Sequence, residues 1–168
     1  MALNHRAIGL ANELGELSEI IVKIKKLPIN NSKRINIIEE LGDMCWYLAG
    51  VARFLGQDIK PKKLLQYQIH NASDLHQLIT KMAIQIGKIT EIIKAATYFG
   101  KPINCKELST AFDKLVFAIS YLCKTINVSL EAVLKKNIDK LRIRYPEKFT
   151  EEKALNRDRS QERKALSK

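Results

Sequence analysis

The chain carries a formal net charge of +11 on 168 residues, and its 46% hydrophobic content suffices for one buried core and one globular domain. Its three cysteines form no C-x-x-C pair and no dense pattern, which excludes a disulfide scaffold and favours a reducing compartment. No hydrophobic run approaches the roughly 20 residues of a membrane span, and the N-terminus lacks a signal-peptide core, so we expect a cytoplasmic protein without membrane contacts.

Hydrophobic residues recur with helical spacing along most of the chain, and turn residues mark the helix ends. We expect helices over about residues 6–26, 32–55, 74–98, 105–126 and 130–145, with a short helix over 61–69. Pro28 and Gly56 follow the first two helices, Ser32 is the expected N-cap of the second, and Asn104 with Glu107 forms a capping box. These signals predict an all-α helical bundle over residues 1–149. The charged residues 150–168 are expected to form a mobile tail or a solvated helix.

Two pairs of acids, Glu13 with Glu16 and Glu40 with Asp43, are spaced i, i+3 on two predicted helices. At about 100° per residue, the members of each pair project from one face of their helix. Glu13 falls inside the hydrophobic stripe of the first helix, and Glu40 and Asp43 border the stripe of the second. Acids that simply face solvent are not expected at such positions.

Four carboxylates in one place need a cation, because burying a single unpaired carboxylate costs several kcal/mol. Ligands that are all oxygen, without His or Cys, suit Mg²⁺ or Mn²⁺ better than zinc. The three histidines show no Glu-x-x-His spacing, which argues against a ferritin-like di-iron bundle. Mg²⁺ is commonly shared with substrate phosphates, so the expected substrate is a phosphate ester or anhydride.

The acids stand in ELGE at 13–16 and EELGD at 39–43, followed by WYLA and much later by NIDKLRIRYPEKF. Together these stretches resemble the MazG family of all-α nucleoside triphosphate pyrophosphohydrolases, whose signature is Glu-x-x-Glu, a spacer and Glu-x-x-Asp. The spacer here, residues 17–39, has a length that fits the family. The resemblance implies a MazG-like bundle and Mg²⁺-dependent hydrolysis of a nucleoside triphosphate to the monophosphate and pyrophosphate, of the kind that cleans nucleotide pools.

The resemblance also implies roles for individual residues. The metal ligands would be Glu13, Glu16, Glu40 and Asp43, holding Mg²⁺ or its substitute Mn²⁺. Glu40, or its neighbour Glu39, would accept the proton of the attacking water. The residues expected to contact substrate are Asn137, Lys140, Arg144, Lys101 and Trp46.

An internal repeat is visible in the sequence. Residues 14–21, LGELSEII, align with residues 86–93, IGKITEII, at a shift of 72, and the hydrophobic positions of the second and fourth helices align at a shift of 71. This indicates a duplicated helical hairpin, with repeat 1 over about 5–70 and repeat 2 over about 74–149. Repeat 2 has lost the acids but carries Asn137, Lys140 and Arg144 on one helix stripe. Both repeats would then build one site, either in a monomer whose second repeat replaces a partner subunit or in a homodimer.

Plainer interpretations exist for several of these signals. The acids could pair with lysines at helix borders, and the basic stripe could merely solubilise the last helix. Trp46 lies opposite the main stripe of its helix and fits an interface better than a stacked base. The alternative function is a non-enzymatic MazG relative that binds nucleotide or nucleic acid through its basic surface. Nucleic acid is the less favoured partner, because the basic residues are dispersed and no nucleic-acid-binding motif accompanies them.

Overall fold

The computed structural model describes residues 3–60, 71–147, 150, 152–153 and 156–167, and this part of the chain contains six helices and no strands. The helices are α1 (Leu3–Ile21), α2 (Asn31–Leu55), α3 (Ala72–Phe99), α4 (Cys105–Thr125), α5 (Leu130–Arg144) and α7 (Arg159–Ser167). The predicted all-α class is confirmed for these residues. The short helix expected over 61–69 lies outside them.

Polar caps set most helix boundaries. The expected N-cap Ser32 is wrong, because the side chain of Asn30 accepts a hydrogen bond from the backbone N–H of Lys33 and α2 begins two residues earlier. Gly56 ends α2 in the left-handed conformation that favours glycine. The first helix ends at Ile21 rather than near Lys26, since the chain turns there and buries Ile24 against the core.

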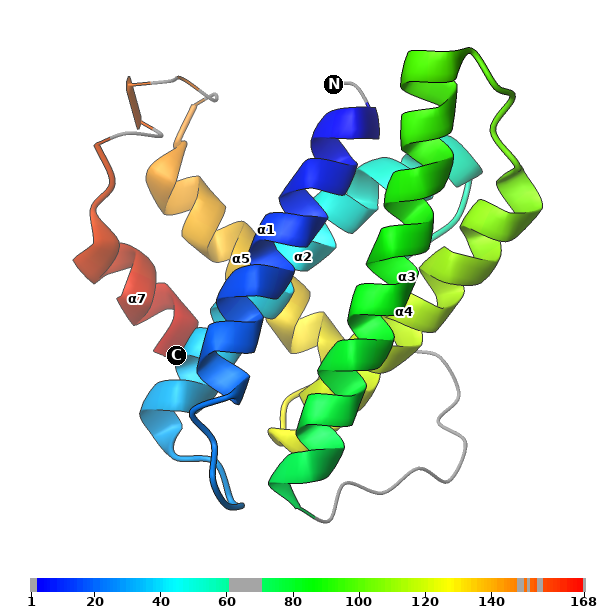
Figure 1. Ribbon diagram of the computed structural model, residues 1–168. Helices are drawn as coiled ribbons and strands as arrows, with labels where there is room; N and C mark the ends of the chain where they lie inside the picture. Colours follow the sequence, from blue (N-terminus) through cyan, green and yellow to red (C-terminus); the bar gives the residue numbers. More distant parts are fainter. Residues whose placement is uncertain (1–2, 61–70, 148–149, 151, 154–155, 168) are drawn as a thin grey trace.

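Two antiparallel hairpins form the body of the molecule (Figure 1). α1 packs against α2, α3 packs against α4, and α1 also packs against α3. Five of the six aligned hydrophobic pairs of α2 and α4 are at most 1% exposed in both helices, while in the sixth pair Leu55 is partly buried and Ile126 is 3% exposed. The five pairs consist of Leu41, Met44, Cys45, Leu48 and Val51 in α2, and Phe112, Leu115, Val116, Ile119 and Leu122 in α4. The hairpins therefore share one hydrophobic core.

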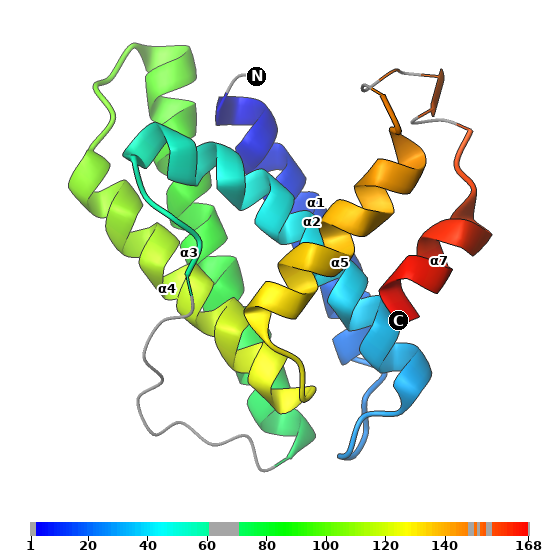
Figure 2. The same ribbon diagram turned by 180° about the vertical axis from the view of Figure 1, so that it is seen from behind.

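The last two helices lie across the first hairpin (Figure 2). α5 crosses α2, and α7 packs against α5 and α2. The structure differs here from the solvated helix or mobile tail expected from the sequence, because Glu162 and Leu166 of α7 are 2% and 1% exposed. Leu166 supplies a hydrophobic contact, and its carbonyl accepts a hydrogen bond from Lys136 Nζ at 2.9 Å. α7 is thus a packed element of the fold.

The described helices include no single one with the length and hydropathy of a membrane span. α4 and α5 pass that test only when they are taken together, and the chain bends by 93° between them. Cys45 and Cys123 are buried free thiols on α2 and α4, whereas Cys105 is exposed. Burial is the main cause that raises the pKa of Cys45, and it raises the pKa of Cys123 to about 12.

Candidate metal centre

Three carboxylates from the first hairpin converge on one point. Glu13 comes from α1, and Glu40 and Asp43 come from successive turns of α2. One carboxylate oxygen from each of the three lies within 4.8 Å of the other two. Glu13 is buried, while Glu40 and Asp43 are partly buried. We call these three residues the acidic trio.

The environment of the trio disfavours negative charge. Burial, the charge of Asp43 and then that of Glu16 raise the pKa of Glu13 to about 6. Burial is also the largest cause for Glu40, and with four neighbouring carboxylates it raises the pKa of that group to about 8. A bound cation would reverse both effects, because an opposite charge within a few ångströms favours the ionised form.

Glu16 lies apart from the trio. Its side chain is exposed and accepts a hydrogen bond from Asn12 Nδ2 at 2.9 Å. It is nevertheless close enough for its charge to raise the pKa values of Glu13 and Glu40. The structure therefore brings together three of the four predicted ligands and leaves Glu16 at the edge of the cluster.

α5 brings polar groups of the second half of the chain to the trio. Asn137 Nδ2 donates a hydrogen bond to Asp43 Oδ1 at 2.7 Å, and Lys140 Nζ donates to Asp43 Oδ2 at 2.5 Å. Gly42 makes this approach possible, because a Cβ atom there would lie 2.8 Å from the Asn137 Cβ atom. The structure thus brings Asn137 and Lys140 to Asp43 within one chain, where the repeat predicted that they would lie.

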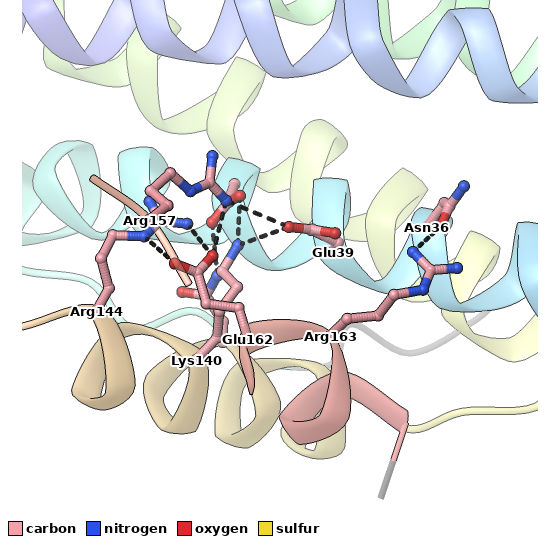
Figure 3. Close-up of polar contacts among 9 residues, drawn as sticks. Asn36, Glu39, Lys140, Arg144, Arg157, Glu162 and Arg163 are labelled. Atoms are coloured by element: carbon pink, nitrogen blue, oxygen red, sulfur yellow. Dashed lines mark hydrogen bonds and ion pairs between the residues drawn. The ribbon is translucent and has the colours of Figure 1, made fainter. Parts of the chain in front are cut away.

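Lys140 is an internal counter-ion in this structure. Its side chain is fully buried, and its ammonium also lies 3.7 Å from Glu39 Oε1. Figure 3 shows Glu39 and Lys140 facing each other across the α2–α5 contact. Glu39, which the sequence places away from the hydrophobic stripe, therefore lies beside the site.

Arg144 is bound by the tail. Its guanidinium donates two hydrogen bonds to Glu162 of α7, at 2.9 and 2.6 Å, and Arg157 Nη2 donates a third to Glu162 at 2.8 Å (Figure 3). Burial alone would raise the pKa of Glu162, but these two arginines outweigh it and lower the pKa to about 2. Arg157 Nη2 also lies 3.7 Å from Glu39 Oε1. The predicted phosphate-binding role of Arg144 therefore meets competition from Glu162.

In the described part of the chain, Lys101 and Trp46 make no hydrogen bond or ion pair with the acidic trio. Lys101 is exposed and lines a hollow beside α3 and α4 that contains no member of the trio. Trp46 is 48% exposed, and the Arg6 guanidinium lies 5.7 Å from the centre of its ring. Their substrate contacts stay predictions.

Sequence patterns assigned no role to several residues that lie at or near the site. Tyr47 packs over Gly9 of α1, where a Cβ atom would lie 2.2 Å from the tyrosine ring. Burial and then the charges of Glu13 and Asp43 raise the pKa of Tyr47. Its position one turn after Asp43 on α2 could have predicted that it lies near the acids. The sequence offered no such indication for Arg157 and Glu162, because their partners are determined by the packing of α7.

Comparisons of this chain with known protein families, curated proteins and solved structures found no match. Carboxylates that resist ionisation, a buried ammonium and two nearby guanidinium groups form a compact arrangement of opposite charges. Such an arrangement is typical of sites that bind a cation together with a phosphate.

Proposed function

We propose that this chain is a MazG-like pyrophosphohydrolase that hydrolyses a nucleoside triphosphate to the monophosphate and pyrophosphate with the help of Mg²⁺. The observation that carries the proposal is the acidic trio, whose oxygens lie within 4.8 Å of one another in a partly buried place. Lys140 and Arg144 of α5 and Arg157 of the tail place positive charge beside the trio, which supports a polyphosphate substrate.

The residues fit a hard divalent cation. The trio offers carboxylate oxygens only, and the described residues around it add no His or Cys ligand. The ammonium of Lys140 and the guanidinium of Arg157, which lies 3.7 Å from Glu39, do not balance the four carboxylates of the trio and Glu39, and the amide of Asn137 is neutral. This donor set suits Mg²⁺ or Mn²⁺, with Glu16 near enough to contribute through a water.

When bound, the metal would polarise the phosphate and lower the pKa of the attacking water. Asn137 and Lys140 each donate a hydrogen bond to one oxygen of Asp43 and so fix the orientation of this carboxylate within the trio. Glu40, or Glu39 on the preceding position of α2, would accept the proton of the water.

The polyphosphate would lie on the side of the trio that carries the arginines. Arg144 is a predicted phosphate contact, and Arg157 joins it because it approaches Glu39 beside the site. Lys140, the other predicted contact, is fully buried on Asp43, so it would act on the phosphate through its charge rather than by contact. Arg144 contacts phosphate only in competition with Glu162, which now occupies both arms of its guanidinium. Guanidinium groups bind phosphate and carboxylate in the same two-pronged way, so this exchange is chemically matched.

The duplication explains why one chain suffices for the site. The aligned positions of α2 and α4 are buried alike, which supports two copies of one hairpin. The first copy supplies the acids, and α5 after the second copy supplies Asn137 and Lys140. We therefore propose that a single chain carries a whole site and that a dimer is not needed to complete it.

The test is a screen of common and modified nucleoside triphosphates with Mg²⁺, scored for pyrophosphate release. We expect release from at least one of them, its loss in EDTA, and its loss in Asp43→Asn. Asp139→Asn is the matched control, because the ion pairs of Asp139 in the described part of the chain, with Lys135 and Arg142, lie at the surface. Nucleotide binding that needs no metal, releases no pyrophosphate and weakens steeply with salt would contradict the proposal and favour the non-enzymatic relative.

A further inference from the structure

The second hairpin has a hollow at the place that corresponds to the acidic trio. The shift of 72 that relates α1 to α3 places Gln85 at the position of Glu13, and the shift of 71 that relates α2 to α4 places Lys114 at the position of Asp43. Both residues line one hollow of about 170 Å³ between α3 and α4. The full lining is Leu78, Lys81, Gln85, Lys114, Phe117 and Ala118.

The chemistry of this hollow is the reverse of that of the trio. A neutral amide and an ammonium replace two carboxylates, and Ala111 stands where Glu40 stands in the first hairpin. Lys81 adds a second positive charge from α3, and both lysines are exposed on a chain of net charge +11. A divalent cation would be repelled here, whereas an anion would be attracted without any metal.

Gln85 adds a specific requirement. Its Oε1 atom is buried and has no hydrogen-bond partner in the described part of the chain. Buried carbonyl oxygens are nearly always paired, so an unpaired one beside a hollow calls for a donor from outside the fold. A ligand that enters the hollow with an N–H group would supply it.

We propose that this hollow binds a nucleoside monophosphate directly, without metal. The volume lies below the roughly 300–1,000 Å³ of sites that enclose a whole drug-sized ligand, so only the base enters. The base lies against Phe117, one of its N–H groups donates to Gln85 Oε1, and the phosphate stays outside with Lys81 and Lys114. Lysines bind phosphate in this way as point charges, and aromatic rings stack on any base.

This second site does not rest on catalysis at the trio. Its direct test is calorimetric titration of the full chain with AMP in EDTA, which silences metal-dependent binding. Adenosine and ribose 5-phosphate carry the two halves of the ligand, and we expect AMP to bind at least about tenfold more tightly than either. We expect Lys114→Glu to weaken AMP binding by at least about tenfold, while Lys124→Glu, an exposed lysine of α4 outside the hollow, leaves it unchanged.

Gln85→Leu separates a binding role from a folding role. Without ligand it should raise Tm, because it removes a buried acceptor that lacks a donor, and it should abolish the rise in Tm that AMP causes in the unchanged protein. Glu40→Gln should leave AMP binding in EDTA as it was. The proposal is overturned if AMP does not bind in EDTA, if ribose 5-phosphate binds as tightly as AMP, or if Glu40→Gln abolishes binding while Lys114→Glu does not.

Discussion

The two helical hairpins bury the same hydrophobic positions, yet the three carboxylates of the first are replaced in the second by two neutral residues and a lysine. The first hairpin has Glu13, Glu40 and Asp43 where the second has Gln85, Ala111 and Lys114. In the first, burial and mutual repulsion raise the pKa of Glu40 to about 8, whereas the second holds no comparable group of acids in its described residues. The shared core therefore explains the fold of both hairpins, whereas the clustered acids of the first hairpin raise one another's pKa values, an effect that the proposed cation would relieve.

The largest expected effect of breaking this asymmetry is on turnover. Glu40→Gln removes one of the three carboxylates while preserving its size, so we expect pyrophosphate release with Mg²⁺ to fall by on the order of 10³-fold. Glu91→Gln in the second hairpin is the control, because Glu91 is exposed and, among the described residues, forms an ion pair with Lys94 on the surface. Full turnover in the Glu40 variant would remove the trio from the mechanism.

Lys140→Met tests the charge that α5 supplies to the first hairpin. Since Lys140 is fully buried against Asp43, its loss leaves that carboxylate without a counter-ion, while Glu39 keeps Arg157 at 3.7 Å. We expect the free energy of unfolding in urea to fall by about 3–5 kcal/mol. Lys135→Met should cost less than about 0.5 kcal/mol, because the Lys135–Asp139 pair is on the surface. Equal effects of the two variants would mean that Lys140 balances no buried charge.

The acidic trio should also give the metal-free protein an unusual pH dependence. Folding raises the pKa of Glu13 from 4.5 to about 6 and that of Glu40 from 4.5 to about 8, so the folded state holds more protons than the unfolded state in that window. Stability is therefore highest at the acid end and falls as pH rises through both folded values. We expect a fall of roughly 2–4 kcal/mol between about pH 5 and pH 8 in EDTA, because solvent screens part of the effect.

Urea unfolding across that range measures this fall, and Glu40→Gln should remove most of it. Saturating Mg²⁺ should remove it too, because the ion favours the ionised carboxylates. Glu162 acts in the opposite sense, since folding lowers its pKa to about 2, and its contribution is lost only as pH falls below about 4.5. A flat profile in EDTA would show that the trio is readily ionised.

The smallest expected effects are on stability, when a glycine of each hairpin is replaced by alanine. Gly42→Ala would push a Cβ atom to 2.8 Å from Asn137, so we expect a loss of about 1–3 kcal/mol in stability and weaker metal binding. Gly87→Ala in α3 meets no atom within 4 Å, so it should instead add about 0.5–1 kcal/mol. Thermal unfolding of both variants measures the difference. A neutral Gly42→Ala would mean that α5 is not held against α2 at this point.

Helical periodicity was sufficient to predict the all-α class and the convergence of Glu13, Glu40 and Asp43. It worked because both helices carry long hydrophobic stripes, and the stripes fix which way each acid faces. The repeat added Asn137 and Lys140, since it assigned α5 to the half of the chain that lacks the acids.

Other features depend on contacts that periodicity does not encode. Glu16 lies at the edge of its stripe, where a small rotation decides between burial and solvent, and α1 leaves it exposed. Asn30, Asn31 and Ser32 can all cap a helix, so the sequence did not select Asn30. The tail contains too few hydrophobic residues to predict packing, and α7 is held instead by the bonds of Glu162 with Arg144 and Arg157.

The two buried thiols give the bundle an internal reporter of its own opening. Cys45 and Cys123 belong to different hairpins, and the charge of Cys123 contributes to the raised pKa of Cys45, so the two lie close together in the core. A thiol-modifying reagent can reach them only when α2 and α4 separate, whereas exposed Cys105 reacts at once. The slow phase of labelling in a Cys105→Ser variant would thus measure how often the hairpins separate, and a ligand that stabilises the folded bundle should lengthen it.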